Sequence, residues 1–165
     1  MILICYDGSP DSKSAIDRGG DLLRGQPATV LTVWEPFFAV ASRAYVGWGT
    51  IAGIPDQVAI DKAILEQAEG LAEEGAQLAR EAGLHAEART CSQETTTAEA
   101  ILTEADAIGA TAILIGSRGL SAFKSVFLGS VSRGVLQDAG RPVIVVPAAD
   151  AAAAREDERP ASKRD

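Results

Sequence analysis

The sequence predicts an α/β fold with a five-stranded, mostly parallel open sheet and helices on both faces. Short runs of apolar and β-branched residues, typical of buried strands, alternate along the chain with longer segments that repeat their apolar residues every three or four positions. The second pattern is typical of amphipathic helices. Strands that are apolar along their whole length indicate a parallel sheet, because helices then cover both of its faces.

The first predicted strand and helix meet at a polar turn. Residues 1–6 form a short apolar run that is followed directly by Asp7-Gly-Ser9. Ser9 is a good N-cap, and Pro10 suits the first position of a helix, where a backbone N–H is not needed. We therefore expect a helix from Pro10 to about Leu23.

A long connection separates the next strand from the next helix. Residues 28–34 are β-branched and apolar and predict the second strand, whereas residues 35–55 are rich in Gly, Pro and aromatic side chains and are expected to be irregular. From Asp56 the apolar residues recur at helical spacing until Gly83, which predicts one long helix. Residues 86–91 alternate small and polar side chains, as a strand with one wet face does.

The same alternation continues to the end of the domain. A capping box, Thr96-x-x-Glu99, predicts the start of a helix that Gly109 ends. Three more elements are expected: a strand over 112–115, a helix from about 130 to 139 and a strand over 143–146. After residue 147 no core pattern remains, so we expect one domain over residues 1–147 and a disordered tail over 148–165.

Composition excludes several classes of function. The formal charge is −8 and no basic stripe is visible, so nucleic acid is not an expected partner. No apolar run approaches the roughly 18 residues of a membrane span, and residues 1–6 do not read as a signal peptide, so we expect a cytoplasmic protein. Cys5 and Cys91 lie far apart without a CxxC pair, which predicts reduced, packed thiols. The single histidine, His85, is expected to be solvated between a helix and a strand.

Two strand ends carry candidate ligand-binding residues. In an open parallel sheet, ligands bind beyond the carboxyl ends of the strands, where the strand order reverses. Asp7 follows the first strand, and Gly116-Ser-Arg-Gly119 follows the fourth. These two loops meet in one crevice if the first and fourth strands are neighbours, a relation that the sequence leaves open.

The loop after the fourth strand has features of an anion site. Gly116 and Gly119 would let the backbone approach a ligand and adopt positive φ. Gly129 opens the following helix, whose free N–H groups and dipole favour an anion. Further donors are available on Arg118, Ser130 and Ser132. The alternative is that the glycines are ordinary turn residues and that Ser130 is only an N-cap.

The spacing of this loop is specific. Gly116-x2-Gly119-x9-Gly129-Ser130 matches in full the G-x2-G-x9-G-(S/T) signature of ATP-binding universal stress proteins, and the chain also resembles that family in its segments ILIGSRG and RPVIVVP. The likeness spans residues 1–147 except the 35–55 connection. It implies a Rossmann-like, adenine-nucleotide alpha hydrolase-like fold and a cytoplasmic stress-response or signalling module that binds ATP, with Mg²⁺ carried on the phosphates.

The resemblance also implies roles for individual residues. Asp7 would accept a hydrogen bond from the adenosine, for example from the ribose, although it could instead cap the following helix. Val33 would offer backbone groups to the adenine edge. The ribose and phosphates would be lined by Gly116, Arg118, Gly119, Gly129, Ser130, Val131 and Ser132.

Catalytic motifs are weak. The sequence lacks a G-x4-G-K-(S/T) loop, and no general base stands beside a nucleophile. A remote likeness of residues 7–12 to the loop of ATP pyrophosphatases fails at two positions. We therefore expect a nucleotide-binding module with at most weak ATP hydrolysis or autophosphorylation on Ser130 or Ser132. A nucleotide-independent interaction protein is the remaining alternative.

Two features outside the pocket suggest contacts with partners. Five of the eight aromatic residues fall in or beside the 35–55 connection, at Trp34, Phe37, Phe38, Tyr45 and Trp48. This connection is expected to fold over the nucleotide, to present an apolar surface, or to pack as an irregular flap on its own domain. The apolar strand 143–146 predicts a homodimer if it lies at a sheet edge, unless a helix covers that edge.

Overall fold

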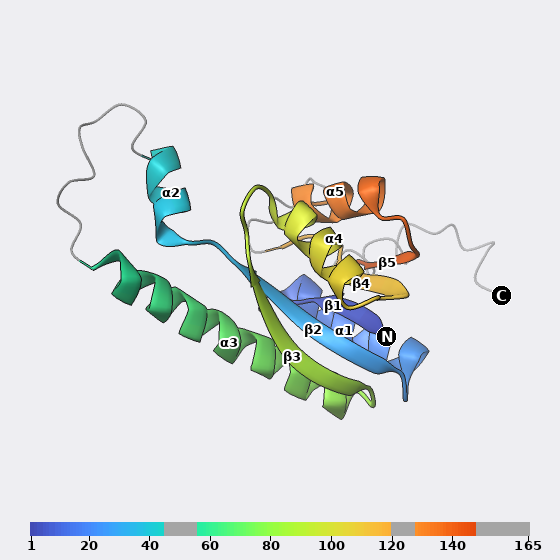
Figure 1. The fold of residues 1–165 in the computed structure, drawn as a ribbon. Coiled ribbons are helices and arrows are strands. Elements are labelled where there is room, and N and C mark those ends of the chain that lie inside the picture. The colour runs from blue at the N-terminus through green and yellow to red at the C-terminus, as the bar shows by residue number, and fades with distance from the viewer. Residues whose placement is uncertain (45–55, 120–127, 148–165) are drawn as a thin grey trace, which may run out of the picture.

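A single parallel sheet forms the centre of the molecule. The computed structural model of the chain describes residues 1–44, 56–119 and 128–147. In these ranges five strands pair in the order β3-β2-β1-β4-β5, and every neighbouring pair is parallel (Figure 1). The strands are β1 Ile2–Cys5, β2 Pro27–Trp34, β3 His85–Ser92, β4 Ala112–Gly116 and β5 Val143–Val146. The predicted fold class is confirmed.

Helices cover both faces of this sheet. Helix α1, Pro10–Leu23, and helix α3, Gln57–Glu81, lie on one face, and helices α4, Thr97–Ala107, and α5, Ser130–Asp138, lie together on the other (Figure 1). Helix α2, Phe37–Ala44, contacts α3. No helix in the described ranges is long and apolar enough to cross a membrane.

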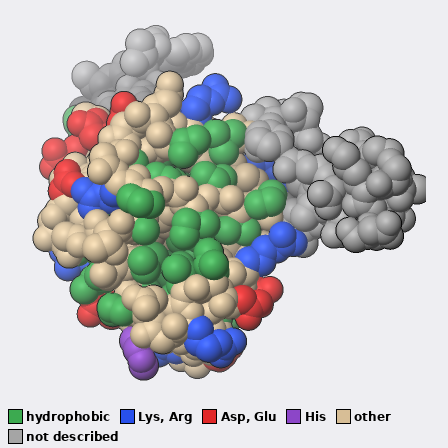
Figure 2. Space-filling model, turned by 90° about the vertical axis from the view of Figure 1, so that its right-hand side faces the viewer, with side chains coloured by type: hydrophobic (Ala, Val, Ile, Leu, Met, Phe, Trp, Pro, Cys, Tyr) green, Lys and Arg blue, Asp and Glu red, His purple; other side chains and the backbone are tan. Residues whose placement is uncertain are grey.

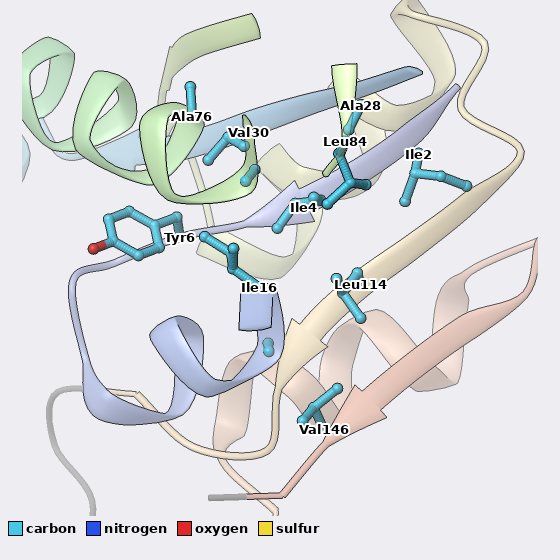
Figure 3. Packing of buried hydrophobic residues seen from close by; sticks show 12 residues of the cluster. Ile2, Ile4, Tyr6, Ile16, Ala28, Val30, Ala76, Leu84, Leu114 and Val146 are labelled. Atoms are coloured by element: carbon cyan, nitrogen blue, oxygen red, sulfur yellow. The ribbon is translucent and has the colours of Figure 1, made fainter. Parts of the chain in front are cut away.

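Two cores form because successive side chains of β1 point to opposite faces. Ile2 and Ile4 pack with α1 and α3, and Figure 3 shows Ile4 between Val30 and Leu114 of the neighbouring strands. Leu3 and Cys5, whose side chains point to the other face, pack with α4 and α5. Leu3, Ile4, Val30 and Leu114 are all 0% exposed, as expected for central strands of a sheet that is covered twice.

The local signals in the sequence act as predicted at most helix ends. The Ser9 side chain accepts a hydrogen bond from the backbone N–H of Ser12 at 3.2 Å, and Thr96 does the same for Glu99 at 3.1 Å. Helix α3 ends just before Gly83, whose φ of 93° lies in the left-handed region that favours glycine. His85 is exposed as expected, although it is the first residue of β3.

The expectation of an irregular connection over residues 35–55 is wrong for its first part. Residues Phe37–Ala44 form α2, whose N-terminus is held when the Phe37 N–H donates to Asp61 Oδ1 of α3 at 2.7 Å. Aromatic content and Pro36 suggested a loop, but Pro36 stands just before the helix, where proline is tolerated. Tyr45, Trp48 and the remainder of the connection lie outside the described residues, as does the predicted tail over 148–165.

The side of the molecule that holds the N-terminus is partly apolar. Figure 2 looks onto this side, where hydrophobic side chains gather near the centre and charged ones lie around them. Met1 is 42% exposed. Because β1 begins at Ile2, this side lies at the amino ends of the strands, opposite to the ends at which ligands bind in such sheets.

Candidate functional site

The strand order reverses between β1 and β4. Strand β1 pairs with β2 on one side and with β4 on the other, so the first and fourth strands are neighbours, as the meeting of the two polar loops requires. A cavity of about 330 Å³ lies at this point, bounded by the carboxyl ends of β1, β2 and β4 and the first turns of α4 and α5. All nine predicted site residues line it, namely Asp7, Val33, Gly116, Arg118, Gly119, Gly129, Ser130, Val131 and Ser132.

Gly116, at the end of β4, and Gly119, in the loop that follows, matter for space rather than for unusual torsion angles. A Cβ atom on Gly116 would lie 2.8 Å from the backbone carbonyl carbon of Asp11, and one on Gly119 would lie 2.8 Å from Asp7 Oδ2. The positive-φ glycines in the described ranges do not include either residue, so the expected left-handed backbone is not found. Gly119 instead leaves room between the loop and the Asp7 carboxylate.

Helix α5 directs free backbone donors towards the cavity. Its N-cap is Gly129, and Ser130 is the first helical residue, so the alternative that Ser130 is the N-cap is wrong. The first intrahelical bond runs from the Arg133 N–H to the Gly129 oxygen at 3.0 Å. The N–H groups of Ser130, Val131 and Ser132 precede that bond and have no acceptor within the helix. Together with the helix dipole, they form a site that favours an anion.

Hydrogen bonds join the two ends of the loop between β4 and α5. The Gly129 N–H donates to the Ser117 oxygen at 2.7 Å, and the Ser132 hydroxyl donates to the Gly116 oxygen at 2.8 Å. Ser132 is buried and its single hydroxyl proton is used in this bond. Ser130, in contrast, is exposed, so its hydroxyl is the more accessible of the two serine donors at this end of the cavity.

Asp7 does not cap α1, because Ser9 performs that role. One carboxylate oxygen, Oδ1, accepts a hydrogen bond from the Ser9 N–H at 3.0 Å across a turn in which Gly8 has a φ of 74°. The other oxygen, Oδ2, faces Gly119. The turn therefore fixes one oxygen of Asp7 and directs the other to the cavity side of the loop.

A buried ion pair that the sequence did not reveal holds Arg118. Asp11 Oδ2 accepts hydrogen bonds from Ser117 Oγ at 3.1 Å, from the Arg118 N–H at 2.9 Å and from Arg118 Nε at 3.3 Å. The two charged side chains are only 7% and 10% exposed. Asp11 resembled an ordinary acidic residue in a first helical turn. Its spacing of four residues from Ala15, on the buried stripe of α1, was the signal that could have identified it.

The opposite end of the cavity is apolar. Val33, at the end of β2, lies there with the almost fully buried Leu31 and with Ile101 of α4. Thr97 lines the cavity one helical turn before Ile101, because residues four apart share a face of a helix. These residues were not predicted, with the exception of Val33, since a helical pattern identifies a buried face but not a cavity wall.

The two cysteines are buried or half-buried free thiols, as expected. Burial raises the pKa of Cys5, and burial also raises the pKa of Cys91, to about 11. Strand β2 lies between their strands and the two residues are offset by two positions in register, so their Cα atoms are more than about 9 Å apart, beyond the roughly 7 Å that a disulfide spans. Among the residues that the structure describes, no group of three His, Cys, Asp or Glu side chains could hold a metal ion.

Comparison with known proteins identifies the family of this chain. The model of the universal stress protein family matches residues 1–147. The solved structure of hypothetical protein MJ0577 is similar over 88% of this chain and 94% of its own, with 20% identity and a TM-score of 0.69. A search of the curated proteins gave no match.

Two further structures are similar and contain nucleotides. A universal stress protein from Archaeoglobus fulgidus in complex with dAMP matches over 88% of this chain and 95% of its own, with 20% identity and a TM-score of 0.56. A universal stress protein in complex with cAMP matches over 90% and 97%, with 20% identity and a TM-score of 0.60. At this level of identity the likeness shows the fold alone, a Rossmann-like parallel sheet with helices on both faces.

Proposed function

The chain belongs to the universal stress protein family, and on that premise we propose that its cavity binds an adenine nucleotide, with ATP as the nucleotide that the glycine signature favours. One observation carries this proposal. The free N–H groups at the start of α5 and the Asp7 carboxylate line the same cavity as an apolar end formed by Val33, Leu31 and Ile101. Phosphate, ribose and base thus each have a matching chemistry. The dAMP and cAMP complexes of related structures support the same ligand class.

Each part of the nucleotide has a place in this proposal. The base lies against the apolar end, where the backbone of Val33 reaches its edge. A ribose hydroxyl donates to Asp7 Oδ2, and the phosphates accept hydrogen bonds from the backbone and hydroxyl of Ser130 and from the N–H groups of Val131 and Ser132. Mg²⁺ is carried on the phosphates, where oxygen ligands suit it. Arg118 acts from its position against Asp11 and shapes the loop.

The protein acts as a nucleotide-binding module in a cytoplasmic stress response rather than as a fast enzyme. The Ser132 hydroxyl donates to a backbone oxygen, and among the described residues neither serine of the site is hydrogen-bonded to a general base. If the protein autophosphorylates, Ser130 is the acceptor, because it is exposed. Phosphate transfer to the protein that persists in a Ser130→Ala variant would contradict that assignment.

A calorimetric titration tests nucleotide binding. Wild-type protein stripped of nucleotide should bind ATP with an affinity near micromolar, and Gly119→Val should abolish binding, since a side chain there enters the space beside Asp7. Gly140→Val is the matched control, because nothing lies within 4 Å of the position of its Cβ. No heat with ATP, ADP or AMP at several temperatures, or unchanged binding by Gly119→Val, would refute the proposal.

We also propose that the protein forms a homodimer through β5. This strand is the last in the sheet, and the carbonyls of Pro142 and Val146 accept hydrogen bonds from Ile113 of β4 and from Ser117 just after it. Alternate residues of a strand bond to the same neighbour, so the backbone groups of Val143 and Val145 point away from β4. A second copy related by a two-fold axis can pair with them.

A further inference from the structure

At the apolar end of the cavity, the wall includes a hydroxyl on Thr97 whose proton is already used in a hydrogen bond. Thr97 Oγ1 donates a hydrogen bond to Gln93 Oε1 at 2.5 Å, while Thr97 itself lines the cavity beside Ile101 and Val33. A hydroxyl has one proton and two lone pairs. With its proton turned to Gln93, Thr97 has only acceptor capacity left for a ligand.

The orientation of the Gln93 amide is fixed from its far side. Gln93 Nε2 donates to Glu35 Oε1 at 3.3 Å and to the Thr95 carbonyl oxygen at 3.4 Å, and the Gln93 backbone N–H donates to the Trp34 oxygen at 2.7 Å. A flipped amide would place Oε1 against a carboxylate and a carbonyl, which only accept hydrogen bonds. Glu35 therefore determines the direction of the bond from Thr97 to Gln93.

We propose that Thr97, oriented by Gln93 and Glu35, is a specificity-determining residue that selects a base with an amino group at its edge, that is, adenine over a 6-oxopurine. This inference rests on the proposed nucleotide function and on the base lying at the apolar end of the cavity, which Thr97 lines together with Val33 and Ile101. The 6-amino group of adenine donates to the lone pairs of Thr97. The 6-oxygen of hypoxanthine is an acceptor and would meet an acceptor, which leaves both groups unpaired and disfavours binding.

Matched nucleotides test the proposal, because ATP and ITP carry the same ribose and triphosphate and differ at the 6-position and at N1, which bears a proton in the 6-oxopurine. Wild-type protein should bind ATP roughly five- to ten-fold more tightly than ITP in calorimetric titrations, the size expected for one hydrogen bond. Thr97→Val keeps the shape of the side chain and removes the acceptor, so the ratio of the two affinities should fall several-fold, while any preference that comes from the backbone of Val33 remains. Thr103→Val, an exposed position on the same helix, should leave the ratio unchanged.

A second variant tests whether the preference for ATP over ITP depends on the orientation of the Thr97 hydroxyl and not only on its presence. Gln93→Leu removes the acceptor that holds the Thr97 proton, so the hydroxyl can rotate and donate to a 6-oxygen. ITP affinity should then rise several-fold while ATP affinity stays within about two-fold, opposite to the loss of ATP affinity in Thr97→Val.

The outcomes separate this inference from the nucleotide proposal itself. If wild-type protein binds ATP but does not discriminate against ITP, or if Thr97→Val keeps the wild-type ratio, the role of Thr97 is refuted and nucleotide binding stands. An unchanged ITP affinity in Gln93→Leu refutes the orienting role of Gln93. If neither nucleotide binds wild-type protein, the proposed function fails and this inference fails with it.

Discussion

At the scale of single residues, the pair formed by Asp11 and Arg118 joins the start of α1 to the loop that bounds the cavity. The Asp11 carboxylate accepts from the backbone and side chain of Arg118 and from Ser117. A buried pair of this kind contributes little net stability compared with apolar packing, but removal of one member takes an opposite charge away from a buried group and is costly. Asp11 thereby determines where the loop after β4 begins.

Substitution of Asp11 should destabilise the protein strongly. We expect Asp11→Ala to lower the free energy of unfolding by about 3–5 kcal/mol, because the Arg118 guanidinium stays buried and loses the Asp11 carboxylate. Urea denaturation followed by circular dichroism measures this change. Asp21→Ala, which breaks an exposed pair with Arg24, should change stability by less than about 0.5 kcal/mol. Equal effects of the two substitutions would contradict the assignment.

Cys5 should make the stability fall at alkaline pH. Burial raises the pKa of the folded thiol well above its ordinary value of 9.0, so the folded state keeps its proton where the unfolded state loses it. Stability from this group is therefore complete below pH 9 and declines above it, with a slope of about 1.4 kcal/mol per pH unit. Urea denaturation from pH 8 to 10.5 should show a steeper decline for wild type than for Cys5→Ala. Parallel curves would contradict this origin.

At the scale of elements, the sequence predicted the helices and helix ends that depend on local signals. Ser9 and Thr96 cap their helices as predicted, and Gly83 follows the end of α3, because capping depends on residues adjacent in the chain. Helix α2 was missed, since its N-terminus is held by Asp61, more than twenty residues away in sequence. The same reasoning explains why Gly116 and Gly119 were predicted and Asp11 was not.

Helix α3 contains two glycines that provide a matched test of packing. A Cβ on Gly75 would lie 2.7 Å from the Tyr6 ring and 2.9 Å from Val30 Cγ1, whereas one on Gly70 would have nothing within 4 Å. We expect Gly75→Ala to destabilise the protein by about 1–3 kcal/mol through overpacking. Gly70→Ala should stabilise it by about 0.5–1 kcal/mol through helix propensity. Thermal denaturation of both variants checks the pair, and a stabilising Gly75→Ala would refute the close approach of α3 to the sheet.

At the scale of the whole molecule, the order of the strands decides where the function lies. The sequence placed polar residues at the ends of the first and fourth strands but could not show that these strands are neighbours, because pairing depends on the path of the chain through space. The order β3-β2-β1-β4-β5 supplies that relation and brings Asp7 and Gly119 together. The apolar wall that includes Thr97 could not be predicted from the sequence either. Helix α4 reaches the cavity only because the chain passes over one face of the sheet between β3 and β4.

The same strand order leaves β5 at an edge, where assembly can be tested. Val145→Pro removes an N–H that points away from β4, so the sheet should persist while pairing with a second copy is lost. Light scattering at micromolar concentration should give a dimer mass for wild type and for Val145→Thr, and a monomer mass for Val145→Pro. A monomeric wild-type protein, or a dimeric Val145→Pro variant, would contradict the β5 interface.

The central claim is that one cavity at the carboxyl ends of β1, β2 and β4 holds the nucleotide. The most direct measurement is a titration of ¹⁵N-labelled protein with ATP, followed by the chemical shifts of the backbone amides. We expect one saturable set of shifts, centred on Asp7 and Val33 at one end and on Ser130–Ser132 at the other, while α2 changes little. Absence of saturable shifts at millimolar ATP, or shifts confined to residues outside the cavity, would contradict the account.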